Sequence, residues 1–498
     1  MVYISCVPPP GLSREDRAFF GTLADIVYGN AFAANRIQSV AELVPGATLE
    51  SLRRDEQALA RVVAPRLERY LRAGGIQAPG LSDADRWLIA RAALYVCYIR
   101  GLRQFDAHIE RQAAKAGEPL PVSFADSVVG DLVRCGYDEE SALRYFALFF
   151  QLRRGFNFIR SGLTGASPSM YRLREALWNN IFTHDVRGFE AALWSRMEDF
   201  STLVLGETGT GKGAVAAAIG RSSFIPYDRA RQRFAANFTQ TFIAINLSQF
   251  PETIIESELF GHRKGAFTGA IDHHEGIFAR CNEHGALFLD EIGEVSIPVQ
   301  IKLLQVLQER TFTPVGGREQ RRFGGRVIAA TNQPLASLRG DGRFRNDFFY
   351  RLCSDVIEVP TLRQRIAESP AELELLVRLL VTRIAGSELP ELVSLVMDAL
   401  EANLPRDYAW PGNVRELEQA VRRILVTGRY TGEPVRPPVG EGAALAAKLA
   451  AGELTADELL GRYGALLHRR CGSYAEVARR LGVDVRTARK YVASAKAA

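Results

Sequence analysis

The sequence lacks the features of a secreted, disulfide-bonded or membrane protein. Its six cysteines are scattered, and none forms a CxxC pair or a Cys/His cluster with metal-ligand spacing, so reduced thiols are expected. The longest apolar runs, such as Tyr145–Phe150, are far shorter than the roughly 20 residues of a membrane span. No basic stretch followed by an apolar core and a cleavage site opens the chain. We expect a cytoplasmic protein with no membrane partner.

Internal repeats are also absent, and 498 residues are too many for one hydrophobic core, so several domains are expected. The hydrophobic content of 47% and the charged content of 24% are typical of a globular protein. Positive charge is concentrated at the end of the chain. Residues 461–498 carry nine basic and two acidic side chains, an excess larger than the net charge of +5 of the whole chain. This basic tail predicts a polyanionic partner.

The pattern of apolar residues changes along the chain and predicts a multidomain protein. Residues 1–165 show helical spacing and, by their position, predict a regulatory domain. Residues 166–362 alternate continuous apolar strands with helical patterns, which is typical of a parallel sheet covered on both faces. Helical patterns return in residues 363–430, a Gly-, Pro- and Ala-rich linker is expected at 431–452, and a small helical unit at 453–498.

The first 165 residues contain no alternation of strands and helices with an aspartate after a strand, so a receiver domain is not expected there. They do contain an aromatic stripe. We interpret it as hydrophobic core rather than as a ligand pocket; its members are Tyr137, Tyr145, Phe146, Phe149 and Phe150.

A phosphate-binding loop is predicted where the strand-like run STLVL leads through GETGTGKG into a helical pattern. Glycines let successive backbone N–H groups turn toward phosphate oxygens, and the helix N-terminus adds a favourable dipole. The lysine would reach the β- and γ-phosphates. A glycine replaces the usual Ser or Thr after the lysine, so this motif alone leaves a glycine-rich turn without nucleotide as an alternative. The predicted nucleotide contacts are Gly206, Glu207, Thr208, Gly209, Thr210, Gly211, Lys212 and Gly213.

Two acidic residues, Asp290 and Glu291, follow a second apolar strand in GALFLDE. A carboxylate at the end of a strand can hold Mg²⁺, and its neighbour can orient and deprotonate the attacking water. A solvated loop is the alternative for an isolated acidic pair. Combined with the phosphate loop, the pair predicts ATP hydrolysis, with Asp290 as the Mg²⁺ ligand and Glu291 as the catalytic base.

Further motifs occur in one order: ESELFGHRKGAFTGA, GALFLDEIGEV, KLLQVLQE, AATN, FRNDFFYRL, VPTLRQR and WPGNVRELEQA. With them the chain resembles, over residues 163–430, the AAA+ ATPases that activate sigma-54 RNA polymerase, the bacterial enhancer-binding proteins. The resemblance implies an α/β AAA+ core at 166–362 and a helical lid at 363–430. It also implies a homo-oligomeric ring, a hexamer, that remodels the sigma-54 RNA polymerase holoenzyme at the cost of ATP.

The resemblance assigns roles to residues near the predicted phosphates. Asn246, at the end of TFIAIN, matches the asparagine that holds the catalytic glutamate until the partner-binding loop engages. Thr331 and Asn332 match the first sensor, which reports the γ-phosphate. Arg415 in WPGNVRE matches the second sensor, which belongs to the lid and contacts the nucleotide.

Two further arginines, Arg345 and Arg351, match the arginine fingers that reach the ATP of a neighbouring subunit. An arginine supplied in this way stabilises transition-state charge and makes hydrolysis depend on the ring. A surface salt bridge is the alternative for each of these arginines and for Arg415. The chain departs from the family pattern at Gly213, usually Glu, and at Arg263, usually acidic.

The GAFTGA segment carries no group that could bind a nucleotide or act as a nucleophile, yet it is close to diagnostic of the family. The resemblance implies that it is the surface that contacts sigma-54. Its glycines would let the loop move between nucleotide states while an aromatic ring and a hydroxyl are displayed. The predicted contacts are Gly265, Ala266, Phe267, Thr268, Gly269 and Ala270.

The end of the chain, GSYAEVARRLGVDVRTARKYVASAKAA, predicts a helix-turn-helix. Ser473 and Glu476 have the spacing of a capping box, and Gly482 marks the turn. Asp484 can cap the second helix, in which Val485, Ala488 and Val492 are expected to face inward.

The outward face of that second helix is basic and suits the major groove of double-stranded DNA. The unit is similar to the Fis-type domain of these activators, and the expected partner is DNA upstream of a promoter. A helical hairpin used for dimer packing is the alternative. The predicted DNA contacts are Arg486, Thr487, Arg489 and Lys490.

The leading hypothesis is therefore an ATP-driven activator of sigma-54-dependent transcription. A second hypothesis keeps the ATPase but changes the client, as in a chaperone-like or DNA-processing AAA+ protein. A third is a DNA-binding repressor whose ATP site serves only as a switch, which the glycine at position 213 slightly favours.

Overall fold

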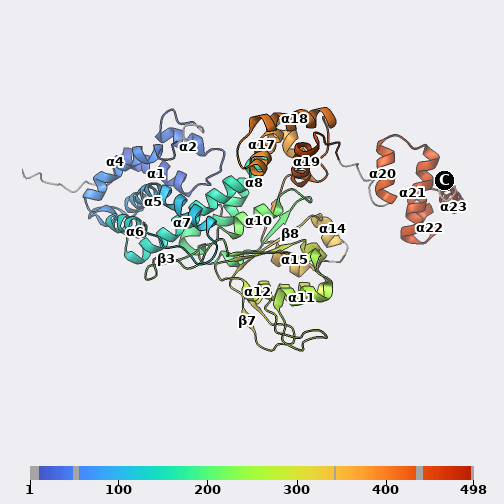
Figure 1. The fold of residues 1–498 in the computed structure, drawn as a ribbon, viewed down its shortest axis with the longest axis horizontal. Coiled ribbons are helices and arrows are strands. Elements are labelled where there is room, and N and C mark those ends of the chain that lie inside the picture. The colour runs from blue at the N-terminus through green and yellow to red at the C-terminus, as the bar shows by residue number, and fades with distance from the viewer. Residues whose placement is uncertain (1–10, 49–54, 341, 343, 433–440, 495–498) are drawn as a thin grey trace, which may run out of the picture. The chain divides into compact units, whose positions relative to one another are not determined.

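The structure is a computed structural model that describes residues 11–48, 55–340, 342, 344–432 and 441–494. The chain forms two compact units, divided between Tyr430 and Thr431, and each is described separately (Figure 1). Within the described ranges, no helix has both the length and the apolar character needed to cross a membrane.

The first unit begins with helices, as predicted. Ser82 and Asp138 start the two longest, because each side chain accepts a hydrogen bond from the backbone N–H three residues further on. Phe146 and Phe150 are fully buried between them, so this part of the aromatic stripe is core. The helices are α1 (Arg14–Tyr28), α2 (Arg36–Leu43), α4 (Ala58–Arg72), α5 (Asp83–Ala114), α6 (Ala125–Arg134), α7 (Glu139–Gly162) and α8 (Pro168–Phe182).

A five-stranded sheet follows, and all its neighbouring strands pair in parallel, which confirms the predicted fold class. Crossing the sheet, the order is β4 (Phe242–Asn246), β5 (Ala286–Asp290), β8 (Arg326–Thr331), β1 (Thr202–Leu205) and β9 (Asp355–Glu358). The chain order reverses beside β1, and ligands of such sheets bind outside the carboxyl ends of the strands at this point.

Successive residues of the strands point to opposite faces and enter two different cores. On one face, Val204 and Ile328 join a core that continues into α10 (Lys212–Gly220) and into the N-terminal helices. On the other face, Leu203 and Ala329 join a core with the remaining helices of this region. Those helices are α11 (Glu252–Phe260), α12 (Ile277–Arg280), α13 (Ile297–Glu309), α14 (Leu335–Gly340) and α15 (Asn346–Leu352).

Two short hairpins extend the sheet region, β2 (Tyr227–Asp228) with β3 (Arg233–Phe234) and β6 (Thr311–Phe312) with β7 (Arg321–Arg322). Four helices then form a separate core around Val377 and Leu417, consistent with the helical region expected after the sheet. They are α16 (Leu362–Glu368), α17 (Ala371–Ala385), α18 (Pro390–Asn403) and α19 (Asn413–Thr427).

The second unit contains α20 (Glu441–Ala450), α21 (Ala456–Cys471), α22 (Tyr474–Leu481) and α23 (Val485–Ser494). Helix α20 lies inside the stretch predicted as a linker. It can form there because its Ala, Leu and Lys residues are strong helix formers. Residues 433–440 of that stretch, and Lys496 of the basic tail, lie outside the described residues.

The turn between α22 and α23 forms as predicted. Gly482 has φ +68°, and Asp484 accepts from the backbone N–H groups of Arg486 and Thr487. One expectation is wrong: Val485 is 43% exposed, because the first turn of α23 lies beyond the small core that buries Ala488 and Val492.

Helix α7 of the N-terminal region is joined to α10 by a fully buried arginine. Arg154 donates from Nη1 to the carbonyl of Arg221 at 2.6 Å and from Nη2 to that of Ser223 at 2.7 Å. Gln151 donates to the carbonyl between them, that of Ser222, at 2.9 Å. These carbonyls follow the C-terminus of α10, where a positive charge also interacts favourably with the helix dipole. Burial lowers the pKa of Arg154 to about 9.

We predict that Arg154→Met destabilises the first unit by about 2 kcal/mol, because it leaves two buried carbonyls unpaired while nearly preserving volume. The measurement is urea unfolding of the full-length protein followed by tryptophan fluorescence. Arg14→Met, at an exposed position at the start of α1, is the control and should match the unchanged protein. Equal midpoints for all three proteins would contradict the prediction.

Candidate active site

The predicted phosphate loop, residues 206–213, leaves β1 at the carboxyl edge of the sheet, and its last two residues begin α10. Gly209 and Gly211 have φ values of +82° and +105°, a region that L side chains rarely adopt, so both positions need glycine. Thr210 braces the loop from inside, because its hydroxyl donates to the carbonyl of Glu207 at 2.8 Å. Gly213 lies exposed in the first turn of α10, and a Cβ there would meet only Phe288, at an ordinary contact distance of 3.9 Å, so no neighbour requires a glycine there.

Lys212 is buried beneath this loop, and its Nζ donates to the carbonyl of Gly206 at 2.9 Å. Desolvation lowers the pKa of Lys212, while the nearby carboxylates of Glu291 and Asp290 act in the opposite direction. The ammonium and the acidic pair therefore lie within electrostatic range of one another, although they are far apart in the sequence.

Asp290 ends β5, and Glu291 takes the left-handed backbone conformation with φ +56°. The backbone N–H of Glu291 donates to Asp290 Oδ1 at 3.1 Å. A non-glycine residue in this conformation costs on the order of 1 kcal/mol and persists only where its surroundings enforce it. The turn therefore sets the direction in which the Glu291 side chain leaves the sheet.

Asn246 lies opposite Asp290 in the register of β4 and β5. Its Oδ1 accepts from the backbone N–H of Ser248 at 3.0 Å and from the Ser248 hydroxyl at 2.7 Å. Within the part of the chain that the structure describes, it makes no hydrogen bond to Glu291.

Thr331 and Asn332 lie at the end of β8, the strand between β5 and β1. Thr331 is fully buried, and its Oγ1 accepts from the backbone N–H of Gln333 at 3.1 Å. Asn332 Nδ2 donates to Thr208 Oγ1 of the phosphate loop at 3.1 Å. Of the two residues matched to the first sensor, Asn332 thus contacts the loop directly and Thr331 precedes it in the chain.

The helical bundle of α16–α19 closes over the phosphate loop. The backbone N–H of Arg415 donates to the carbonyl of Gly209 at 3.3 Å, while its side chain stays exposed. Asn413 Nδ2 donates to the carbonyl of Thr208 at 3.1 Å and to Glu207 Oε2 at 3.2 Å. Glu207 also forms an ion pair with Arg363 of α16.

Asn413 and Arg363 were not predicted as site residues. Asn413 has φ +53°, a conformation in which asparagine is enriched, and it follows a Pro-Gly turn in WPGNVRE. The motif therefore carried a signal for an unusual backbone at this position. Arg363 had no such local signal, because its partner Glu207 is distant in the sequence.

Arg345 and Arg351, matched to arginine fingers, lie on or next to α15 and do not reach the phosphate loop of their own chain. Arg345 pairs with Asp347 at 2.7 Å, and Arg351 Nε donates to the carbonyl of Leu307 at 3.0 Å. Among the described residues, neither side chain hydrogen-bonds to the phosphate loop.

The GAFTGA segment forms a tight exposed loop. Its glycines Gly265 and Gly269 have φ values of +79° and +100°, and the backbone N–H of Gly265 donates to the carbonyl of Ala270 at 2.8 Å. The ring of Phe267 is 44% exposed, and Thr268 is exposed beside it. Ala266 is partly buried and Ala270 is buried.

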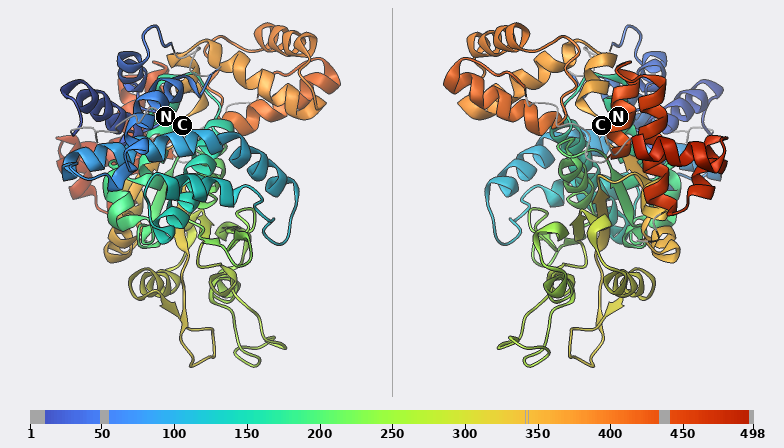
Figure 2. Two further views of the ribbon diagram at one scale, coloured as in Figure 1. Left: turned by 90° about the vertical axis from the view of Figure 1, so that its left-hand side faces the viewer. Right: turned by 90° about the vertical axis from the view of Figure 1, so that its right-hand side faces the viewer.

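A second loop, between β6 and β7, supports the GAFTGA loop, and Figure 2 shows both projecting from the same end of the core. The backbone N–H of Arg263 donates to the carbonyl of Val315 at 3.0 Å. A Cβ added at Gly316 would lie 2.7 Å from Cβ of Ala266. The Arg263 side chain, a departure from the family pattern, pairs with Glu319 at 3.1 Å.

In the second unit, Arg486 and Lys490 are exposed on α23 and form no ion pair among the described residues. The other two predicted DNA contacts are partly engaged. The Thr487 hydroxyl donates to Asp484 at 2.6 Å, and the Arg489 guanidinium lies 5.3 Å from the ring centre of Tyr474.

Comparison with known proteins agrees with this geometry. Residues 187–358 match the Sigma-54 interaction domain, and residues 367–435 match the AAA+ ATPase lid domain. The transcriptional regulatory protein ZraR of Klebsiella oxytoca is 36% identical over 335 residues, which cover 66% of this chain and 67% of ZraR. The chain belongs to the sigma-54-dependent activators.

Another activator of this family, the DNA-binding transcriptional regulator NtrC of Azospirillum brasilense, is 40% identical over 301 residues. The match covers 57% of this chain, which spans only 55% of the length of NtrC. Among solved structures, NtrX from Brucella abortus in complex with ADP covers 75% of this chain and 80% of its own at 22% identity, with a TM-score of 0.40.

In this member of the activator family, we predict that Gly209→Ala weakens binding of a fluorescent ATP analogue at least about tenfold. A Cβ at Gly209 would lie 2.2 Å from the carbonyl oxygen of Gly412, in a backbone conformation that alanine disfavours. Gly21→Ala, in α1 and outside the site, is the control, because a Cβ there meets no atom within 4 Å. Equal affinities of the two variants would contradict a requirement for close contact between loop and lid.

Proposed function

We propose that this chain hydrolyses ATP and uses the energy to activate transcription by sigma-54 RNA polymerase. The observation that carries the proposal is the combination, on one α/β core, of a braced phosphate loop, an acidic pair within range of Lys212, and an exposed GAFTGA loop. Each feature alone has a structural explanation. Their occurrence together in a member of the sigma-54-dependent activators supports a motor coupled to an output surface.

In the proposed reaction, Lys212 exchanges its hydrogen bond with the carbonyl of Gly206 for the β- and γ-phosphate oxygens of ATP. The backbone N–H groups of the loop and the N-terminus of α10 bind the phosphates. Glu291 orients the attacking water and accepts its proton. Asn246 would hold Glu291 in an inactive position before the partner engages, and it would have to release Ser248 to do so.

Asp290 is the residue proposed to hold Mg²⁺. Its carboxylate lies at the carboxyl end of β5, beside the phosphate loop. This position fits Mg²⁺, which ATPases bind through one or two carboxylates and the substrate phosphates. Among the described residues no group of three His, Cys, Asp or Glu side chains could enclose a metal ion. Binding of Mg²⁺ through one carboxylate and the substrate phosphates does not need such a group. When bound, Mg²⁺ neutralises charge on the phosphate oxygens.

We propose that hydrolysis requires a homo-oligomeric ring, a hexamer. Arg345 and Arg351 would reach the γ-phosphate bound to a neighbouring subunit, while Arg415, Thr331 and Asn332 would respond to the nucleotide of their own subunit. Charge stabilisation by an arginine from a neighbour makes the rate depend on assembly.

The GAFTGA loop is proposed to contact sigma-54 through Phe267 and Thr268, which offer an exposed aromatic ring and a hydroxyl. Helix α23 is proposed to bind DNA upstream of the promoter, with Arg486 and Lys490 free to contact phosphates or guanine edges. Arg489 would have to leave Tyr474 to join them.

We predict that Glu291→Gln lowers ATP hydrolysis by about 10²- to 10⁴-fold, the usual contribution of a general base, with ATP still bound. Phosphate release and binding of a fluorescent ATP analogue are measured on the full-length protein. Glu401→Gln, at an exposed position of α18, is the control and should retain full activity. Hydrolysis by the Glu291 variant at the control rate would remove Glu291 from the proposed reaction.

We predict that Thr268→Ala retains ATP hydrolysis but loses sigma-54-dependent transcription, because the hydroxyl lies in the exposed GAFTGA loop, which projects from one end of the core (Figure 2). The assay is transcription in vitro with the sigma-54 holoenzyme. Thr253→Ala, at an exposed position of α11, should keep both activities. Unchanged transcription by the Thr268 variant would favour an ATPase with another client.

A further inference from the structure

The N-terminal helices line an open cavity of about 720 Å³, within the range of small-molecule sites. It lies among α1, α2, α4, α5, α7 and α8, and its lining is mainly apolar. Phe32 lines it together with Phe156 and Trp178, whose ring centres lie 5.4 and 5.9 Å from that of Phe32. Tyr145 and Phe149 of the aromatic stripe also line it, so these two rings do not serve only as core.

Among the residues that the structure describes, the guanidinium of Arg36 has no acidic partner, and it lines this apolar space. Its Nη1 donates to the carbonyl of Ile26 at 2.7 Å. Arg36 is partly buried, and desolvation lowers its pKa, so its charge is incompletely solvated. A negatively charged group in the cavity would compensate this charge.

Three other charged groups that line the cavity, Arg153, Glu56 and Glu190, already have partners of opposite charge. Arg153 donates two hydrogen bonds of 2.6 Å to Asp106 and lies 3.2 Å from Glu56. Glu190 accepts from Tyr145 and Arg91. The charge that remains available to a ligand is therefore positive.

Two phenols complete the polar side of the cavity. Tyr95 and Tyr98 line it, lie close enough to Arg36 to influence its pKa, and make no hydrogen bond within the described ranges. Desolvation raises the pKa of Tyr98 to about 12, so this hydroxyl stays neutral and able to donate at physiological pH. The hydroxyl groups of Tyr95 and Tyr98 could then donate hydrogen bonds to an anionic oxygen placed beside Arg36.

We propose that this cavity binds a small amphipathic carboxylate, with its apolar body among the aromatic rings and its carboxylate paired with Arg36. An apolar pocket with few convergent polar groups is the usual form of a small-molecule site. Pairing a carboxylate with the desolvated guanidinium would provide selectivity against neutral analogues of the same shape.

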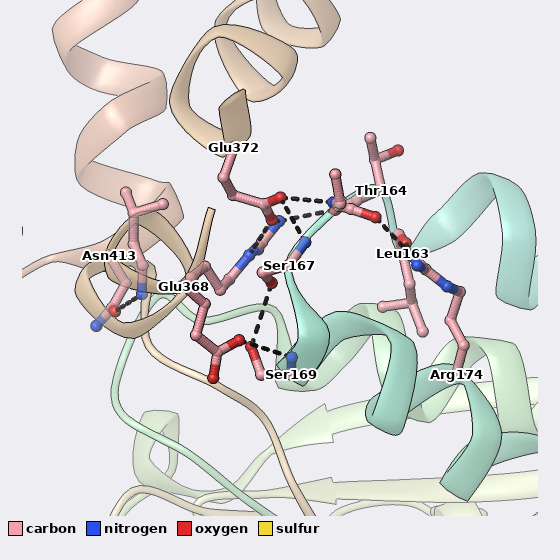
Figure 3. A network of polar contacts seen from close by, with 12 residues as sticks. Leu163, Thr164, Ser167, Ser169, Arg174, Glu368, Glu372 and Asn413 are labelled. Carbon is pink, nitrogen blue, oxygen red and sulfur yellow. Dashed lines mark hydrogen bonds and ion pairs between the residues drawn. The ribbon is translucent and has the colours of Figure 1, made fainter. Parts of the chain in front are cut away.

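The cavity also touches the segment that ties the N-terminal region to the lid. Thr164, Gly165 and Ala166 line the cavity and lie between α7 and α8. Figure 3 shows how the lid holds them: buried Glu372 of α17 accepts from the backbone N–H groups of Ala166 and Ser167.

The same network leads on to the phosphate loop. Arg365 of α16 pairs with Glu372 and donates to the carbonyl of Thr164 at 2.7 Å. The backbone N–H of Leu362, which begins α16, donates to Asn413 Oδ1 at 2.9 Å, and Asn413 contacts the loop residue Thr208. A ligand that shifts 164–166 would therefore act on the lid. This coupling, unlike the binding, rests on the proposed ATPase function.

Binding is tested by isothermal titration of the full-length protein with octanoate and 4-phenylbutyrate, each compared with its neutral amide. The acids should bind and the amides should bind at least about tenfold more weakly. Arg36→Gln should remove this difference, whereas Arg14→Gln should preserve it. Ile37→Trp, which fills the cavity from α2, should abolish binding and serves if the Arg36 variant fails to fold.

The proposal is overturned if neither acid binds at millimolar concentration, if acids and amides bind alike, or if Ile37→Trp binds as the unchanged protein does. Coupling predicts that a saturating acid changes ATP hydrolysis at least about twofold and that Ile37→Trp loses the response. Binding without this response leaves the ligand site standing and removes the coupling. Absence of any hydrolysis would contradict the proposed function instead, and the titration would still decide the site.

Discussion

Parallel pairing in the central sheet is the constraint on which the candidate active site depends. The register of β4 with β5 sets Asn246 opposite Asp290, and that of β1 with β8 sets Leu205, the residue before the phosphate loop, opposite Thr331. All carboxyl ends of a parallel sheet lie along one edge, so residues widely separated in the sequence meet there. A slip of one residue would turn each of these side chains to the opposite face. The strands are nearly continuously apolar and carry polar residues only at their ends.

The N-terminal helices are packed onto this sheet, because they share a hydrophobic core with one of its faces. Helix α10 is held at both ends: its N-terminus carries the phosphate loop, and the carbonyls after its C-terminus accept from Arg154 and Gln151 of α7. Residues 164–167, between α7 and α8, are hydrogen-bonded to the lid. Any rearrangement of α7 and α8 would therefore act on the ATPase core through hydrogen bonds as well as through apolar packing.

Sequence reasoning predicted what local motifs encode and missed what only the tertiary fold assembles. The parallel sheet, the glycine positions of the phosphate loop and the turn at Gly482 follow from short patterns with a known backbone requirement. The contacts of Glu207 with Arg363 and Asn413 were missed because they join distant segments without a shared pattern. The cavity was missed for the same reason. Tyr145 and Phe149 are buried in the core as expected, and they also line the cavity, which helical spacing alone does not reveal.

The backbone at the acidic pair suggests why the site would depend on its surroundings. Glu291 is held in a left-handed conformation, Asn246 is engaged with Ser248, and Arg345 is engaged with Asp347. Each of these three residues thus has a local constraint or partner within its own chain. Under the proposed mechanism, Arg345 exchanges its contact for the nucleotide of a neighbouring subunit when hydrolysis proceeds, whereas Asn246 exchanges its contact for Glu291 when the site is inactive. Because every exchange trades one hydrogen bond or ion pair for another of similar kind, its net free energy is small. Binding of a ligand or of a partner subunit can reverse a small difference in free energy between the two sets of contacts.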